Sequence, residues 1–205
     1  MNIARGSRKP LPICCKCKKE AACPANRFMN EFAGTRKAGV LLIKLCPTEE
    51  ECSRRLLYVS NAGQQFNSMF SKIMGCTLQE CTTYVLVKCC VDKVKKKHIT
   101  NCMENSPLNV LMQHRKVVVC LGRDVLRYVF MRGAAPPSMD ILLGHAVRAS
   151  ECKNPIITLP DPERLLDVDE DGGRYYDALK ELQKKYGDMK TGLYSVRALL
   201  QGNQP

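Results

Sequence analysis

The sequence has no long hydrophobic run, and this absence bears on where the protein works. Apolar residues make up 45% of the 205-residue chain, but none of their runs approaches the roughly 18 residues that a membrane span needs. The basic start, with Arg5, Arg8 and Lys9, leads into cysteines rather than an apolar segment, so no secretory signal is predicted. We therefore expect an intracellular protein with no membrane partner, in the cytoplasm or nucleoid or, for a viral chain, in the host cell.

Internal repeats and low-complexity tracts are also absent, and there are only three histidines. His114 stands before a predicted strand, and His145 follows a Leu-Leu-Gly segment. Neither belongs to a recognisable catalytic pair, so we interpret both as structural residues.

Cysteine is abundant instead, with 13 residues. An odd number in a chain of this size, with nothing that directs it to an oxidising compartment, does not favour a disulfide scaffold. Metal ligation and buried thiols are the better explanation. Cysteines in apolar segments behave as small hydrophobic residues, and we expect this of Cys76, Cys81, Cys120 and Cys152.

Two cysteine pairs, Cys14-x2-Cys17 and Cys89-x12-Cys102, could together form a four-sulfur metal site. Such a site holds either zinc or an iron–sulfur cluster. Three more cysteines leave the exact ligand set open: Cys15, Cys23 and Cys90.

The net charge of +12 is unevenly distributed, with +14 on residues 1–150 and −2 on residues 151–205. A partner with a dense phosphate backbone is the simplest consequence, since each neutralised phosphate releases counterions; the alternative is a soluble basic protein with no such partner. The segment between the second cysteine pair has four lysines in five positions: Lys93, Lys95, Lys96 and Lys97. We expect this loop to contact DNA, and its alternative is a solvated surface loop.

Four short apolar runs alternate with helical patterns, which predicts an α/β sandwich with a mostly parallel central four-stranded sheet. The strands are expected at Val40–Ile43, Thr83–Val87, Lys116–Leu121 and Ile156–Leu159. The helices are expected at Ala25–Ala33, Asn61–Ile73, Pro107–Gln113, Asp124–Met131 and Tyr175–Tyr186. We divide the chain into a basic flexible leader (1–12), one domain (13–190) and a C-terminal tail (191–205).

Six segments, in order, resemble the iron–sulfur branch (family 4) of the uracil-DNA glycosylase superfamily. Segments 40–51 (VLLIKLCPTEEE) and 58–67 (YVSNAGQQFN) are similar to a strand that leads into Gly-Glu-x-Pro-Gly-Glu-Glu-Glu-Asp, followed by Pro-Phe-Val-Gly-x-Ala-Gly-x-x-Leu. Segments 84–89 (YVLVKC) and 99–102 (ITNC) are similar to Ile-Thr-Asn-Val-Val-Lys-Cys and to the start of the fourth-cysteine helix, and 117–122 (VVVCLG) to Val-Ile-Val-Ala-Leu-Gly. Segment 157–166 (ITLPDPERLL) stands where Thr-Tyr-His-Pro-Ala-x-Leu-Leu would be.

The resemblance implies a three-layer sandwich and a structural [4Fe–4S] cluster, with zinc as the alternative. Its ligands would be Cys14, Cys17, Cys89 and Cys102. Tyr58 would stack on a base, and the helix entry at Ala62 and Gly63 would hold a phosphate.

The polar residues of the family's site have no counterparts here. The family's first-motif Glu falls at Leu45, its flanking glycines at Lys44 and Thr48, and the Asn that reads uracil at Val85. The His falls at Asp161 when Pro162 is matched to the family proline, or at Pro160 without that shift. A carboxylate repels the uracil anion that a histidine would stabilise, and proline offers no donor.

We therefore predict a DNA-binding, uracil-DNA glycosylase-like protein that has lost ordinary uracil excision and acts as an accessory in DNA replication, repair or modification. A polymerase or another replication or repair protein is a candidate partner, by analogy alone. The alternative is a DNA glycosylase or base-processing enzyme acting on uracil or a modified base, with Tyr58 stacking and Asp161 or Glu49 as the working carboxylate. A third hypothesis is an inhibitor or assembly protein that uses the fold as a platform.

Overall fold

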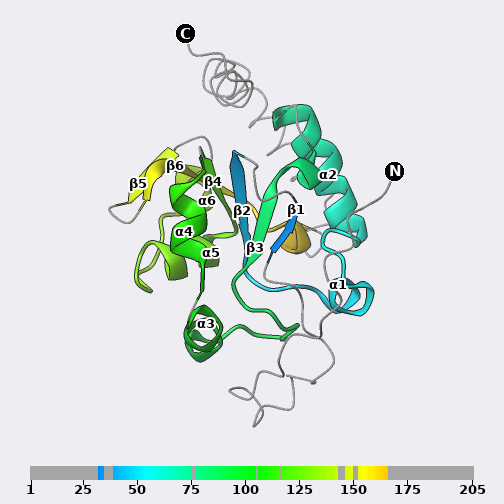
Figure 1. Cartoon of the computed structure of the whole chain (residues 1–205), viewed down its shortest axis with the longest axis horizontal. Coiled ribbons are helices and arrows are strands. Elements are labelled where there is room, and N and C mark those ends of the chain that lie inside the picture. Colours follow the sequence, from blue (N-terminus) through cyan, green and yellow to red (C-terminus); the bar gives the residue numbers. More distant parts are fainter. Residues whose placement is uncertain are drawn as a thin grey trace.

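A six-stranded sheet in the order β1-β3-β2-β4-β6-β5 forms the centre of the computed structural model (Figure 1). The structure describes residues 32–34, 39–74, 77–104, 106–115, 117–142, 146–149 and 152–165. The four central strands are parallel: β2 (Val40–Lys44), β3 (Thr82–Val85), β4 (Val117–Leu121) and β6 (Cys152–Leu159). They are the four strands that the apolar runs predict.

Two short antiparallel edge strands correct the predicted count from four strands to six. β1 (Phe32–Gly34) pairs with β3, and β5 (Ala146–Ala149) pairs with β6. Strands of three and four residues at the sheet edge need no continuous apolar run, so they leave no strong pattern in the sequence. Ala33 therefore belongs to a strand and not to the expected helix at Ala25–Ala33, most of which lies outside the described residues.

Both faces of the central strands are buried, as expected for a parallel sheet covered by helices. Alternate residues face two apolar clusters, so that Leu41 and Ile43 lie in one and Val40 and Leu42 in the other. Cys120 is buried, and burial raises the pKa of its thiol; Cys81 and Cys152 are buried too, as predicted for these three cysteines. Cys76 lies outside the described residues.

Helices cover the sheet on both faces, which gives the predicted three layers (Figure 1). Phe66 and Phe70 of α2 (Asn61–Met74) pack on one face. The other face is covered by side chains from α4 (Leu108–Gln113), α5 (Arg123–Val129) and α6 (Met139–Leu142). The expected helix at Tyr175–Tyr186 lies outside the described residues, and no helix in the described part is long and apolar enough to cross a membrane.

The carboxyl ends of the parallel strands lead into the segments that carry most of the candidate site. β2 is followed by α1 (Glu49–Arg54), β3 by α3 (Lys96–Met103), and β6 by the 3-10 turn η2 (Pro162–Leu165). A second 3-10 turn, η1 (Leu78–Glu80), precedes β3. In open α/β sheets, ligands bind at the carboxyl ends of the strands.

Candidate functional site

A buried lysine at the end of β2 is the centre of the site. Lys44 is 1% exposed, and its Nζ donates to Glu51 Oε2 at 2.6 Å. The same ammonium lies 3.6 Å from Glu163 Oε1, on η2. One cation therefore lies between carboxylates from two segments that are far apart in the sequence.

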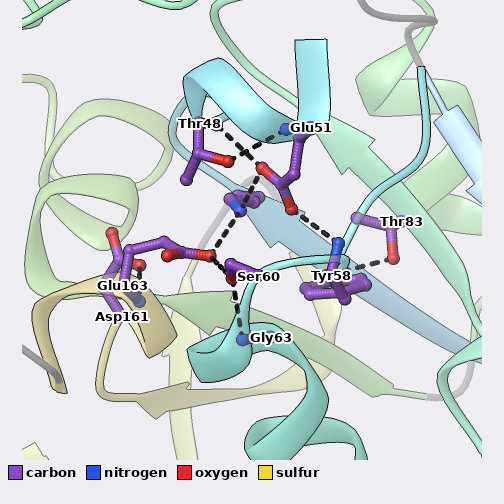
Figure 2. Close-up of polar contacts among 9 residues, drawn as sticks. Thr48, Glu51, Tyr58, Ser60, Gly63, Thr83, Asp161 and Glu163 are labelled. Atoms are coloured by element: carbon purple, nitrogen blue, oxygen red, sulfur yellow. Dashed lines mark hydrogen bonds and ion pairs between the residues drawn. The ribbon is translucent and has the colours of Figure 1, made fainter. Parts of the chain in front are cut away.

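Glu51 connects three parts of the chain around this lysine (Figure 2). Its Oε2 also accepts from the Thr48 backbone N–H at 2.8 Å, and its Oε1 accepts from the Tyr58 N–H at 2.6 Å. Thr48 Oγ1 accepts from the Glu51 N–H at 3.2 Å, which completes a capping box at the start of α1. Because Glu51 is fully buried and its two oxygens accept three hydrogen bonds, it is a positioning carboxylate.

Tyr58, the predicted base-stacking residue, lies against this network and is held on several sides. Its OH is 3.2 Å from Thr83 Oγ1, and its ring centroid lies 5.8 Å from that of Phe66 and 5.4 Å from Lys44 Nζ. Burial raises the pKa of the phenol, and the negative charge of Glu51 raises it further, whereas the hydrogen bond with Thr83 lowers it. The residue has a φ of 60°, which is unusual for a non-glycine residue and is fixed here by the bond to Glu51.

Ser60 connects the start of α2 to η2. Its Oγ accepts from the Gly63 N–H at 3.0 Å and lies 2.8 Å from Glu163 Oε1, to which it donates. A Cβ on Gly63 would lie 2.5 Å from Tyr58 Cα, so only glycine permits this approach. The predicted phosphate site at Ala62 and Gly63 is thus a buried helix start whose Gly63 N–H already has an acceptor.

The two predicted catalytic carboxylates occupy different environments. Asp161 is partly buried after β6, where its Oδ1 accepts from the Glu163 N–H at 3.1 Å. A Cβ on Gly122, which follows β4 with a φ of 95°, would lie 3.3 Å from the Asp161 Cβ. Glu49 is exposed in the first turn of α1, where a negative charge favours the helix start. Of the two, Asp161 is the one that the structure brings to the site.

Cys46, between β2 and α1, adds a thiol to the site. Burial raises its pKa to about 12; the charges of Asp161 and Cys90 also raise it, and Lys44 acts in the opposite direction. The thiol is therefore protonated at neutral pH and is a poor nucleophile.

The second cysteine pair belongs to two segments that a lysine joins. Lys88 Nζ donates to the carbonyl oxygen of Cys102 at 2.8 Å, and the neighbouring Cys89 is 5% exposed. Among the described residues no group of three or more metal-ligating side chains occurs. Cys14 and Cys17, with the alternatives Cys15 and Cys23, lie outside that part of the chain.

The predicted DNA-contacting lysines form an exposed turn at the start of α3, which we call the lysine turn: Lys93, Lys95, Lys96 and Lys97. His98 is 4% exposed, and its Nδ1 accepts from the Lys95 N–H at 3.2 Å. The lysine turn is thus tied to the helix by a residue that sequence reasoning missed, although its place three positions after the N-cap was a usable signal.

The two histidines interpreted as structural give little further information. His114 is exposed after α4, and His145 lies outside the described residues. Sequence reasoning also missed the roles of Lys44, Ser60 and Glu163. Of these, only Ser60 had a local signal, as a serine placed before an amphipathic helix.

Comparison with known proteins identifies a family. The family model described as the uracil DNA glycosylase superfamily matches residues 31–183, about three quarters of the chain. No curated protein matches this sequence.

Proposed function

Because the chain belongs to the uracil DNA glycosylase superfamily, we propose that it is a DNA-binding member in which ordinary uracil excision has been lost. It would act as an accessory in DNA replication, repair or modification. The observation that carries this proposal is the ion-pair network of Lys44, Glu51 and Glu163 beside Tyr58.

The network replaces small residues in the pattern that the sequence resembles. Lys44 stands at the first glycine of Gly-Glu-x-Pro-Gly, and Glu163 stands at the alanine of His-Pro-Ala when Pro162 is matched to the proline. The two replacements have opposite charges and lie 3.6 Å apart. Their charges therefore compensate each other. Together they place two long side chains where the family pattern has a glycine and an alanine.

These replacements disfavour the excision of uracil. A flipped uracil needs polar groups along its edge and a positive or donor group near its departing anion. Here the cation Lys44 is bonded to Glu51 and close to Glu163, and Asp161 adds a further carboxylate next to Glu163. Val85 and Leu45 are buried apolar residues that offer no hydrogen bond to a base.

DNA binding is supported by charge on the surface rather than in the site. The chain has a net charge of +12, and the lysine turn presents four exposed cationic residues next to a helix start. Cations on an ordered turn neutralise phosphates at a smaller entropic cost than cations on a mobile loop.

We also propose a [4Fe–4S] cluster on Cys14, Cys17, Cys89 and Cys102. The two described members fit this role, because Lys88 holds the Cys102 backbone beside the segment of Cys89. The resemblance matches Cys89 to the family's ligand and leaves the partly buried Cys90 as the alternative. When bound, the cluster would supply a structural brace, and the lysine turn lies between its last two ligands.

An excision assay tests the central proposal. Single- and double-stranded oligonucleotides with uracil, hypoxanthine, xanthine or 5-hydroxymethyluracil are incubated with the full chain, and abasic sites are revealed by alkaline cleavage. We expect no abasic sites with any base, alongside binding that weakens as salt rises. Release of any base would overturn the proposal and support the glycosylase alternative, in which Tyr58 stacks and Asp161 or Glu49 serves as the carboxylate.

Colour and metal content test the cluster. Anaerobically purified protein should be brown and contain iron and sulfide. Cys89→Ala and Cys102→Ala should each lose the colour, and Cys90→Ala is the matched control that should keep it. Colourless protein with bound zinc would establish the zinc alternative instead.

A further inference from the structure

A buried arginine stands at the edge of the sheet opposite the candidate site. Arg115 lies between α4 and β4, two residues before β4 begins, so it is at the amino end of the parallel strands. It is 6% exposed, and its Nε is buried without a hydrogen-bond partner. Arginine is almost never fully buried unless it is paired, and its guanidinium keeps its positive charge. A buried cation of this kind needs an anion.

The described residues supply no such anion. The Met112 carbonyl accepts from the Arg115 backbone N–H at 3.2 Å and from Asn154 Nδ2 at 2.9 Å. Both lone pairs of this oxygen are therefore used, and none is left for the guanidinium. Burial lowers the pKa of Arg115, and no carboxylate within the described part of the chain counteracts this effect. The guanidinium thus keeps donors that are free to bind a ligand.

A second cation stands at the same edge. β4 and β6 are parallel, with Val118 opposite Ile156. Arg115 and Lys153 each precede this pair by three residues, so the register brings both to the amino edge of the sheet. Lys153 is exposed, and neither cation takes part in an ion pair between described residues. The edge therefore has a local positive potential.

We propose that Arg115 is the centre of a binding site for a small oxyanion, a phosphate or carboxylate group, and that Lys153 attracts the anion to it. A guanidinium presents its N–H donors in a fixed fork that matches the oxygens of either group. Pairing removes the cost of a buried charge without a partner. The ligand is small, because a residue that is 6% exposed offers no surface on which a DNA backbone or a protein could lie.

This site is separate from the proposed DNA-binding surface. The lysine turn follows β3 and therefore lies beyond the carboxyl ends of the strands, whereas Arg115 lies at their amino ends. The anion site consequently does not depend on the proposed function, and Arg115→Met should bind DNA with the salt slope of the unaltered protein.

Thermal unfolding of the full-length chain tests the site. Phosphate or succinate is titrated at constant ionic strength, which is kept with sodium chloride. An anion that binds only the folded state raises Tm with its concentration, by about 5–10 °C at about one hundred times Kd. A response to phosphate alone would identify a phosphate ligand, and a response to succinate alone would identify a carboxylate. No response to either anion would overturn the proposal.

Variants connect the response to the arginine. Arg115→Met keeps a long side chain but removes an unpaired buried charge, so Tm in chloride buffer should be unchanged or higher and the response to the anion should be lost. Lys153→Met should weaken anion binding about two- to threefold. Lys95→Met, in the exposed lysine turn, is the control and should keep the full response. If Arg115→Met kept the response, or lost stability equally with and without the anion, the residue would have no role in anion binding.

The Arg115 Nε–H provides a measurement on the unaltered protein, which does not require any variant to fold. In nitrogen–proton correlation spectra its resonance, assigned through bonds, should move downfield as the anion is added. A resonance that stays in place while Tm rises would locate the anion elsewhere and refute the site.

Discussion

The interior of the site and its rim use charged residues in opposite ways. In the interior, Lys44 pairs with Glu51 and Glu163, Glu51 also accepts from two backbone N–H groups, and Lys44 and Glu51 are almost completely excluded from solvent. At the rim, the lysine turn and Arg55 face solvent. The comparison teaches that interior charges determine the shape of the site, whereas rim charges lie on the exposed surface, where a polyanion can reach them.

Loss of Glu51 should produce the largest effect on the interior. Glu51→Ala removes the partner of a buried ammonium, one half of a capping box and the acceptor for the Tyr58 N–H. We expect a loss of about 3–5 kcal/mol in the free energy of unfolding, measured by urea denaturation. Glu50→Ala, one residue earlier in an exposed pair with Arg54, should cost less than about 0.5 kcal/mol. Equal costs would show that the interior network contributes no special stability.

Charge reversal at the rim should weaken DNA binding but leave the stability of the fold nearly unchanged. Changing Lys95, Lys96 and Lys97 to Glu should reduce the salt slope of DNA binding by about three, if each lysine contacts one phosphate. The free energy of unfolding should change by no more than about 0.5 kcal/mol, since these residues are exposed. Lys153→Glu, at an exposed position near the start of β6, is the control. A triple variant with an unchanged salt slope would remove the lysine turn from the DNA interface.

The smallest predicted effect concerns the reactivity of the buried Cys46 thiol. With its pKa raised from the ordinary value of 9.0 to about 12, Cys46 should react slowly with iodoacetamide at neutral pH and faster as pH rises. A raised pKa means that the folded state favours the protonated thiol, so this contribution to stability is complete below pH 9 and is lost as pH approaches 12. Asp161→Asn should lower the pKa and speed the reaction a few-fold, followed by mass spectrometry of the Cys46 peptide. No change would mean that Asp161 does not influence this thiol.

The central sheet was predictable from the sequence because its strands are buried on both faces. Short continuous apolar runs such as Val117–Leu121 are typical of strands that are buried on both faces. The edge strands were not predictable, since β1 and β5 have only three and four residues and no comparable run. Their pairing depends on neighbours that the local sequence does not specify.

The location of the site was predictable from the sequence, but the hydrogen bonds and ion pairs within it were not. Resemblance indicated Tyr58 and Asp161, and the fold brings both to the carboxyl ends of the strands. A lysine after an apolar strand would ordinarily be expected to reach solvent, so the burial of Lys44 had no local signal. The role of Glu163 depends on Ser60, 103 positions earlier, and only the folded chain brings them together.

The hydrogen bond between Ser60 and Glu163 has a consequence for the order of folding. Forming it closes a loop of about one hundred residues, which is an entropically costly late event compared with the local capping box of α1. A chain in which β2, α1 and α2 have formed but η2 has not docked would have Lys44 paired with Glu51 alone. In that intermediate the Lys44–Glu51 pair is already electrically balanced, so the docking of η2 adds the carboxylate of Glu163, and the last step of folding is the one that gives the network its excess of negative charge.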